Sequence, residues 1–162
     1  MSEAMSSSAA RRFSHLSDSE LIGLIRGYHE AHVRDLEAAA ALARRVEARH
    51  AGSPHYPTGL ADLLARMAES VGSHQHREEA VLFPIILSGE GAMLRQPIAA
   101  LGTEHEDLQD GLERLVRLTR DYTPPDEACA SWRKLYELCR KYDEEFREHV
   151  QLEERILFPR FL

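Results

Sequence analysis

The sequence predicts an all-α protein, an up-down-up-down antiparallel four-helix bundle, and three observations support this fold class. Apolar residues recur at helical spacing in four long stretches. Clusters of turn-forming residues separate these stretches and leave short links, which favour antiparallel neighbours. The length of 162 residues and a hydrophobic content of 43% suit one domain with a sizeable core.

The first predicted helix covers about residues 17–49. Ser17 can cap its N-terminus, and Glu20 stands three residues later, which is the spacing of a capping box. Residues 1–16 lack any periodicity and are polar, so we expect them to be a disordered N-terminal segment. Residues 17–162 then form the folded domain.

A strong helix breaker, residues 51–57, contains Gly and Pro and ends the first helix. Thr58 can cap the second helix, which should run to about Ile86 with a bend at Pro84. The two halves of the bundle meet at the next turn, residues 88–91.

The third predicted helix covers about residues 93–119. The segment Thr123-Pro124-Pro125 separates it from the fourth helix, because proline cannot continue a helix. The fourth helix then continues nearly to the C-terminus.

A motif of His and Glu four residues apart occurs twice, as His74 with Glu78 and as His149 with Glu153. A spacing of four residues is about one helical turn, so both side chains project from the same face. Each copy is followed by Leu-Phe-Pro, at 82–84 and 157–159. This spacing is typical of metal ligands on a helix.

Each copy also has a His-Glu pair upstream at nearly the same distance. His29 lies 45 residues before His74, and His105 lies 44 residues before His149. Counting from the predicted turns at about 1.5 Å per residue places all these residues at similar heights. Four His and two Glu are the ligands that two adjacent, carboxylate-bridged metal ions require inside a four-helix bundle. The candidate ligands are His29, His74, Glu78, His105, His149 and Glu153.

Neighbours of the candidate ligands have open roles. His32, one turn from His29, is either a group that orients a ligand or a seventh ligand, and we favour the orienting role. Glu104 can orient a ligand His, whereas we interpret Glu30 and Glu106 as solvated charges on the helix surface. Tyr28 either packs in the core or closes the site.

Nitrogen and oxygen donors without a thiolate suit iron or manganese, and iron is the better fit for a redox centre. We expect two iron ions with an oxo or hydroxo bridge. Such a centre has an open position for a small ligand such as NO, O₂ or H₂O₂. The alternative is a metal-free bundle whose His and Glu only hydrogen-bond, but that leaves buried charges at a heavy desolvation cost.

The composition bears on partners and location. The formal charge of −7 and the absence of a basic stripe argue against nucleic acid as a partner. The longest apolar run is too short for a membrane span, and the pair Arg11-Arg12 is not followed by the apolar stretch of a signal peptide. We therefore expect a cytoplasmic protein. Cys129 and Cys139 lie about 15 Å apart on one helix, too far for a disulfide, so both should be reduced thiols with a structural role.

Five motifs stand in order along the chain: Tyr28-His29-Glu30-Ala31-His32; His74-x-x-x-Glu78-Glu79 with Leu82-Phe83-Pro84; Glu104-His105-Glu106; Thr123-Pro124-Pro125-x-Glu127-Ala128-Cys129 with Trp132; and His149-x-x-Leu152-Glu153 with Leu157-Phe158-Pro159-Arg160. In these motifs, from about residue 18 to the end, the chain resembles the hemerythrin-like superfamily. It is most similar to the repair of iron centres family, di-iron proteins linked to nitric oxide and oxidative stress. The resemblance implies the same six ligands, with Glu78 and Glu153 bridging.

The resemblance leads to three functional hypotheses. The first is a di-iron stress-response protein that handles NO or supplies iron to damaged iron–sulfur proteins. The second is an O₂ carrier or sensor, against which Gln109 stands at the position where the oxygen-carrying hemerythrins have another His. The third is an enzyme, a di-iron peroxidase or NO reductase. Typical members of the repair family also carry a small N-terminal domain with a Cys pair, and this sequence starts almost directly at the bundle. If that domain receives or passes iron, we expect this protein to do so differently or with a partner.

Overall fold

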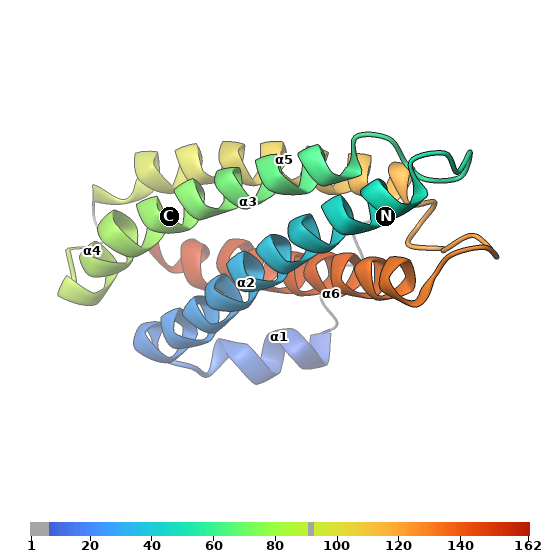
Figure 1. Ribbon diagram of the computed structural model, residues 1–162. Helices are drawn as coiled ribbons and strands as arrows, with labels where there is room; N and C mark the ends of the chain where they lie inside the picture. Colours follow the sequence, from blue (N-terminus) through green and yellow to red (C-terminus); the bar gives the residue numbers. More distant parts are fainter. Residues whose placement is uncertain (1–6, 91–92) are drawn as a thin grey trace.

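The computed structural model describes residues 7–90 and 93–162, and within them four long helices lie side by side as a bundle (Figure 1). These helices confirm the predicted all-α fold, with ends within two residues of the expected limits at most boundaries. The bundle helices are α2 (Asp18–His50), α3 (Leu60–Arg77), α5 (Arg95–Leu118) and α6 (Ala130–Leu152).

The starts of α2 and α3 differ in how well the sequence predicts them. The Ser17 hydroxyl accepts a hydrogen bond from the Glu20 backbone N–H, and the Glu20 side chain accepts one from the Ser17 backbone N–H, so the capping box is confirmed. The expected Thr58 cap is wrong. The residue before α3 is Gly59, with a φ of 89°, and no side chain caps that end. Glycine tolerates this left-handed conformation because it has no Cβ.

The helices that carry the repeated motif both change winding just after it. Short π-helices, η1 (Glu78–Leu82) and η3 (Glu153–Leu157), follow α3 and α6. In each, the backbone N–H of the following Phe donates to the Glu carbonyl five residues back. The Pro that follows each Phe has no N–H and would clash with the carbonyl four residues earlier in a regular helix. The wider turn therefore replaces the simple proline bend that the sequence suggested.

Short helices complete both chain segments beyond the π-turns. They are α4 (Phe83–Ser88) after η1 and η4 (Phe158–Phe161) after η3.

The segment before the bundle departs from the expectation of disorder. Residues 1–6 lie outside the described residues, but Ser7–Ser14 form helix α1, which contacts η3. Phe13 and Leu16 pack against the apolar core, and the Arg160 guanidinium donates hydrogen bonds to the carbonyls of Ser14 and Leu16. These contacts are long-range in sequence, which is why the local pattern of residues 7–16 does not reveal them.

The core consists of two apolar clusters with a polar layer between them. One cluster gathers side chains such as Leu36, Leu64 and Trp132, and the other gathers Ile25, Phe83 and others near the π-turns. Each bundle helix, taken with any π-helix that follows it, contributes apolar side chains to both clusters. The candidate ligands of each helix lie near the point where its contribution changes from one cluster to the other. The predicted register therefore holds, and the polar side chains share one level.

Both cysteines are free, as expected, and they differ in their surroundings. Cys139 is fully buried on α6, and burial followed by the charge of Asp143 raises the pKa of its thiol to about 12. Cys129 is half-buried at the start of α6, with its Sγ 3.3 Å from Nε2 of His50.

We expect iodoacetamide at pH 8 to label Cys129 and to leave Cys139 unmodified in the folded protein. The thiolate is the reactive form, and burial with a raised pKa removes both thiolate and access at Cys139. Mass spectrometry of labelled peptides measures this, with labelling in urea as the control in which both cysteines react. Equal labelling of both cysteines before unfolding would contradict the packing of α6.

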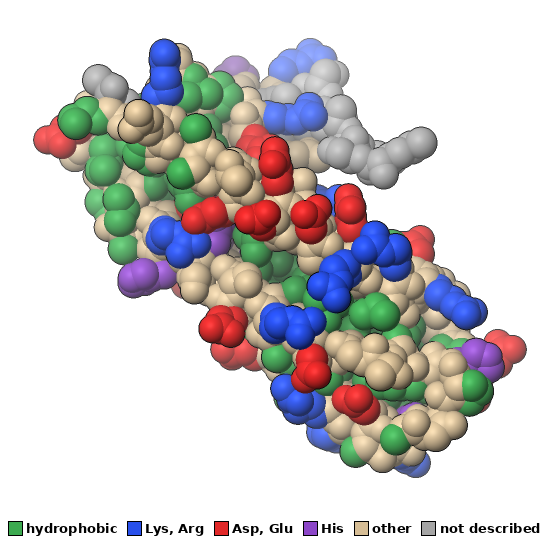
Figure 2. All heavy atoms as spheres, turned by 90° about the horizontal axis from the view of Figure 1, so that it is seen from above, with side chains coloured by type: hydrophobic (Ala, Val, Ile, Leu, Met, Phe, Trp, Pro, Cys, Tyr) green, Lys and Arg blue, Asp and Glu red, His purple; other side chains and the backbone are tan. Residues whose placement is uncertain are grey.

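The surface carries charges of both signs. On the face drawn in Figure 2, acidic and basic side chains are interspersed, and no single sign covers that face. No helix in the described residues is long and apolar enough to cross a bilayer.

Candidate metal centre

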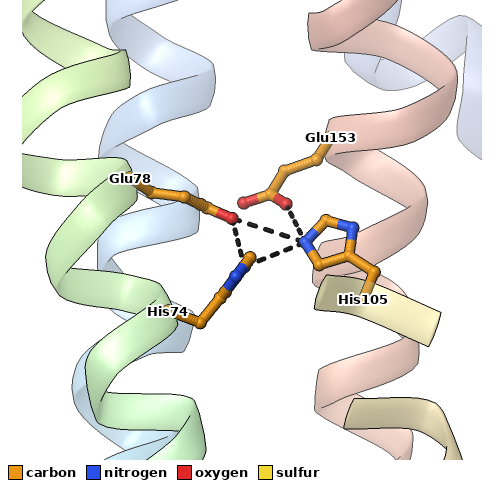
Figure 3. A group of neighbouring side chains, drawn as sticks. All are labelled: His74, Glu78, His105 and Glu153. Carbon is orange, nitrogen blue, oxygen red and sulfur yellow. Dashed lines mark hydrogen bonds and ion pairs between the residues drawn. The ribbon is translucent and has the colours of Figure 1, made fainter. Parts of the chain in front are cut away.

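All six candidate ligands meet in the polar layer at the middle of the bundle. Each is at most 2% exposed, although each carries an ionisable group. They come from all four sides: His29 from α2, His74 and Glu78 from α3 and η1, His105 from α5, and His149 and Glu153 from α6 and η3. Figure 3 shows four of them, His74, Glu78, His105 and Glu153, pointing toward one another.

The six side chains divide into two groups of donor atoms. Nε2 of His105 lies 3.0 Å from Nε2 of His74, and Oε1 of Glu78 is in contact with the ring of His74 and 3.4 Å from Nε2 of His105. The second group contains His29 and His149, whose Nε2 atoms lie 3.9 Å and 3.8 Å from Oε1 of Glu153. We call these the His74–His105 position and the His29–His149 position.

Each of the two glutamates faces both positions. Glu78 turns Oε1 to the His74–His105 position and Oε2 to His29, at 3.5 Å from its Nε2. Glu153 turns Oε2 to His105, at 3.0 Å from its Nε2, and Oε1 to the other position. Each glutamate therefore has one carboxylate oxygen toward each position.

The other ring nitrogen, Nδ1, of each candidate His also has a neighbour. Glu104 lies 2.6 Å from Nδ1 of His74, a contact that places it where it can orient this ring. Nε2 of His32 lies 2.8 Å from Nδ1 of His149, so His32 contacts a candidate ligand on the ring nitrogen that faces away from the other donor atoms. Glu30 and Glu106 are exposed, as expected.

Two of these neighbours were not recognised from the sequence. Glu154 bonds Nδ1 of His105 at 3.0 Å, and Glu79 lies 3.4 Å from Nδ1 of His29. Both immediately follow a candidate ligand, so the signal was the doubled Glu in each copy of the motif. A regular helix would place the second Glu about 100° away from the first; these acids meet His residues of neighbouring helices instead of facing the centre.

Aromatic rings enclose the upstream histidines in the same way in both halves. Phe83 stacks on His29 with ring centroids 6.0 Å apart, and Phe158 stacks on His105 at 6.4 Å. Tyr28 lies over His149 at 6.2 Å, and its hydroxyl donates a hydrogen bond to Glu148. Tyr28 therefore covers the side of the site near α6.

Comparison with known proteins bears on this site. A match to the family described as the hemerythrin HHE cation binding domain covers residues 20–161. The chain belongs to this family. The HHE domain extends over all four bundle helices, and all six candidate ligands lie within it.

Curated relatives of this HHE chain share one name. The chain is 37% identical over 139 residues to the iron-sulfur cluster repair protein YtfE of Citrobacter koseri, covering 86% of this chain and 63% of the relative. It is 37% identical over 142 residues to the protein of that name from Dickeya chrysanthemi, covering 88% and 64%. This chain therefore spans less than two thirds of the length of these relatives.

The charges of the buried HHE site are strongly coupled. Burial raises the pKa of most carboxyls, but the neighbouring side chains of Glu153, His105, His29 and His74 outweigh burial and hold the pKa of Glu78 well below its usual range. Burial and the charge of Glu78 raise the pKa of Glu153. Burial opposes protonation of His105, but the carboxylates of Glu153, Glu154 and Glu78 outweigh it and raise its pKa to about 12. Without a cation, only protons on the imidazoles and carboxyls can balance the negative charges of this buried cluster.

The donor atoms fit a bound cation. Hydrogen-bond partners are missing, among the described residues, for Nε2 of His29 and His149, for Oε2 of Glu78 and for both carboxylate oxygens of Glu153. Buried polar atoms without partners are costly, and a cation bound among them would offset that cost. The donors are imidazole nitrogens and carboxylate oxygens, which suit transition metals such as iron or manganese. The site is therefore a metal site of an HHE domain.

Surface clefts bring solvent close to this metal site. A cleft of about 630 Å³ is lined by His29, Gln75 and Glu79, among others, and one of about 320 Å³ is lined by His74, Glu104 and Arg77, among others. Each cleft therefore borders one candidate ligand, His29 or His74, of a different position.

Proposed function

We propose that the domain binds two iron ions in the polar layer, one at each position. The observation that carries this proposal is the placement of the two buried glutamates, each with one oxygen toward each His pair. His74 and His105 would hold one ion, His29 and His149 the other, and Glu78 and Glu153 would bridge them. Iron is favoured over manganese because the relatives are named for iron–sulfur cluster repair.

The chain's own residues prepare this centre. Glu104 and Glu154 accept hydrogen bonds from Nδ1 of His74 and His105, which keeps these two imidazoles in the tautomer that offers Nε2 to a metal. The apolar clusters above and below exclude water and strengthen the attraction between carboxylates and cations. A di-iron centre supplies redox chemistry and open coordination for NO, O₂ or H₂O₂.

We further propose that the protein is a cytoplasmic component of the response to nitric oxide and oxidative stress that handles NO or supplies iron to damaged iron–sulfur proteins. The name of the relatives supports this role, and the all-protein N/O ligation supports an ion that can be exchanged. Gln109, a half-buried residue of α5, counts against an oxygen carrier.

The test is cluster reconstitution. The iron-loaded protein is mixed anaerobically with a cluster-free ferredoxin, sulfide and a thiol, and the cluster absorption is followed. We expect faster cluster formation than with the metal-free protein and a change in the iron spectrum on adding NO. No transfer and no response to NO would remove this role. A stable adduct of the reduced protein with O₂ would instead support the carrier hypothesis.

A further inference from the structure

The two halves of the site repeat one arrangement. His29, His74, Glu78 and Glu79 in the first half correspond to His105, His149, Glu153 and Glu154 in the second. In both halves the second Glu of the pair lies next to Nδ1 of the upstream His of its own half. In both halves the Phe directly after the π-helix stacks on that same upstream His.

The repeat breaks at one place, beside Nδ1 of the downstream His. In the second half the residue before the upstream His is Glu104, and it reaches across to Nδ1 of His74. The corresponding residue of the first half is Tyr28, whose hydroxyl donates to Glu148 instead. The partner of His149 is therefore His32, which corresponds to Leu108 in the other half.

This exchange replaces a carboxylate by a neutral imidazole. A ring that gives Nε2 to a metal carries its proton on Nδ1, so the Nδ1–H of His149 donates a hydrogen bond to Nε2 of His32. A carboxylate in that place makes the ligand a stronger donor, because its negative charge polarises the ring. His32 is 0% exposed and packs against Tyr142 and Phe146, so water cannot replace it as the acceptor.

The Nδ1 contacts of the other three candidate histidine ligands add to the difference between the two positions. His74 and His105 both have a carboxylate oxygen within 3.0 Å of Nδ1. His29 has its carboxylate at 3.4 Å, and its Nδ1 makes no hydrogen bond. Both ligands at one position are thus strongly supported, and both ligands at the other are weakly supported.

We propose that the two positions differ in how readily they release iron. The His29–His149 position, where His32 makes His149 a weaker ligand, releases its iron as cargo, and the His74–His105 position retains its iron. This inference rests on the proposed binding of two iron ions. His32 is a positioning residue, because it acts on the metal only through His149.

The test is the rate at which a chelator removes iron. Protein loaded anaerobically with Fe²⁺ is mixed with excess ferrozine, and the coloured complex is followed in a stopped-flow instrument. We expect two phases of about equal amplitude, one ion each. Mössbauer spectra taken before and after the fast phase should show one of two equal-area signals disappearing.

Matched variants assign the phases. His32→Leu, which installs the residue of the other half, should speed the fast phase about ten-fold and leave the slow phase unchanged. His32→Gln keeps an acceptor for Nδ1 of His149 and should restore most of the original rate. Glu104→Gln should act on the other phase, because it makes His74 a weaker ligand. The slow phase should become about ten-fold faster, and the rate of the fast phase should stay the same.

Release in a single phase would overturn the inference, as would an equal effect of His32→Leu on both phases. If His32→Leu does not fold, Glu104→Gln alone tests the assignment of the phases to the two positions. A change in the fast phase caused by Glu104→Gln would contradict that assignment. Ferrozine replaces the iron–sulfur acceptor in this experiment. Two-phase release without cluster repair therefore keeps this inference and removes only the repair role, whereas a protein that binds no iron loses both.

Discussion

Replacing Glu153 by glutamine is expected to abolish binding of both metal ions while the bundle stays folded. Glu153, like Glu78, is fully buried and has one oxygen toward each position, so each ion loses an anionic ligand. Removing even a residue that only supports a ligand costs about 10–100-fold in metal affinity, so the loss here should exceed about 100-fold. Titration with Fe²⁺ under anaerobic conditions and metal analysis after gel filtration measure it.

The fold should survive Glu153→Gln because the pKa of Glu153 is raised by burial and by Glu78. Glutamine has nearly the same shape and carries no charge, so it avoids the desolvation cost of a buried carboxylate. Glu144→Gln is the matched control, because Glu144 is an exposed acid on α6. Normal binding of both ions by Glu153→Gln would mean that the buried carboxylates do not bridge the metals.

Trp132→Ala is expected to lower the free energy of unfolding by about 3–5 kcal/mol. Trp132 is 0% exposed and lies in the apolar cluster farther from the π-turns, with its ring 5.5 Å from that of Tyr56 and 5.2 Å from that of His50. Its removal leaves a cavity between the loop after α2 and the start of α6. Urea unfolding of the metal-free protein, followed by circular dichroism, measures the change.

Lys134→Ala is the control for Trp132→Ala. Lys134 is exposed on the same helix, and its change should stay within about 0.5 kcal/mol. Trp132 lies 17 residues before His149, about 25 Å along α6, so folded Trp132→Ala should still bind metal at full stoichiometry. A loss below about 1 kcal/mol would show that the loop does not pack on α6 as described.

The sequence predicted the helices and the convergence of the six candidate ligands because both depend on local spacing. The four-residue interval from His74 to Glu78 fixes a common face on a helix, and short links fix the relative heights of the helices. Their role as metal ligands stays a prediction. The capping box at Ser17 was also recognisable, since it needs only two residues three positions apart.

What the sequence did not reveal depends on contacts between elements or on irregular backbone. Glu79 lies next to Nδ1 of His29, and Glu154 lies next to Nδ1 of His105. Both glutamates belong to π-helical turns and reach a histidine on a neighbouring helix. Similarly, the packing of residues 7–16 depends on Arg160, at the other end of the chain. The start of α3 was mistaken because Gly59, not Thr58, adopts the conformation that the turn needs.

The metal content of the protein tests the proposed two-iron site most directly. It is measured together with the visible and Mössbauer spectra, on protein that is purified without oxygen and then loaded with iron. The account predicts about two iron ions per chain, in two environments of equal weight, and loss of both in Glu153→Gln. A folded protein that takes up no iron, or a single ion unaffected by Glu153→Gln, would contradict it.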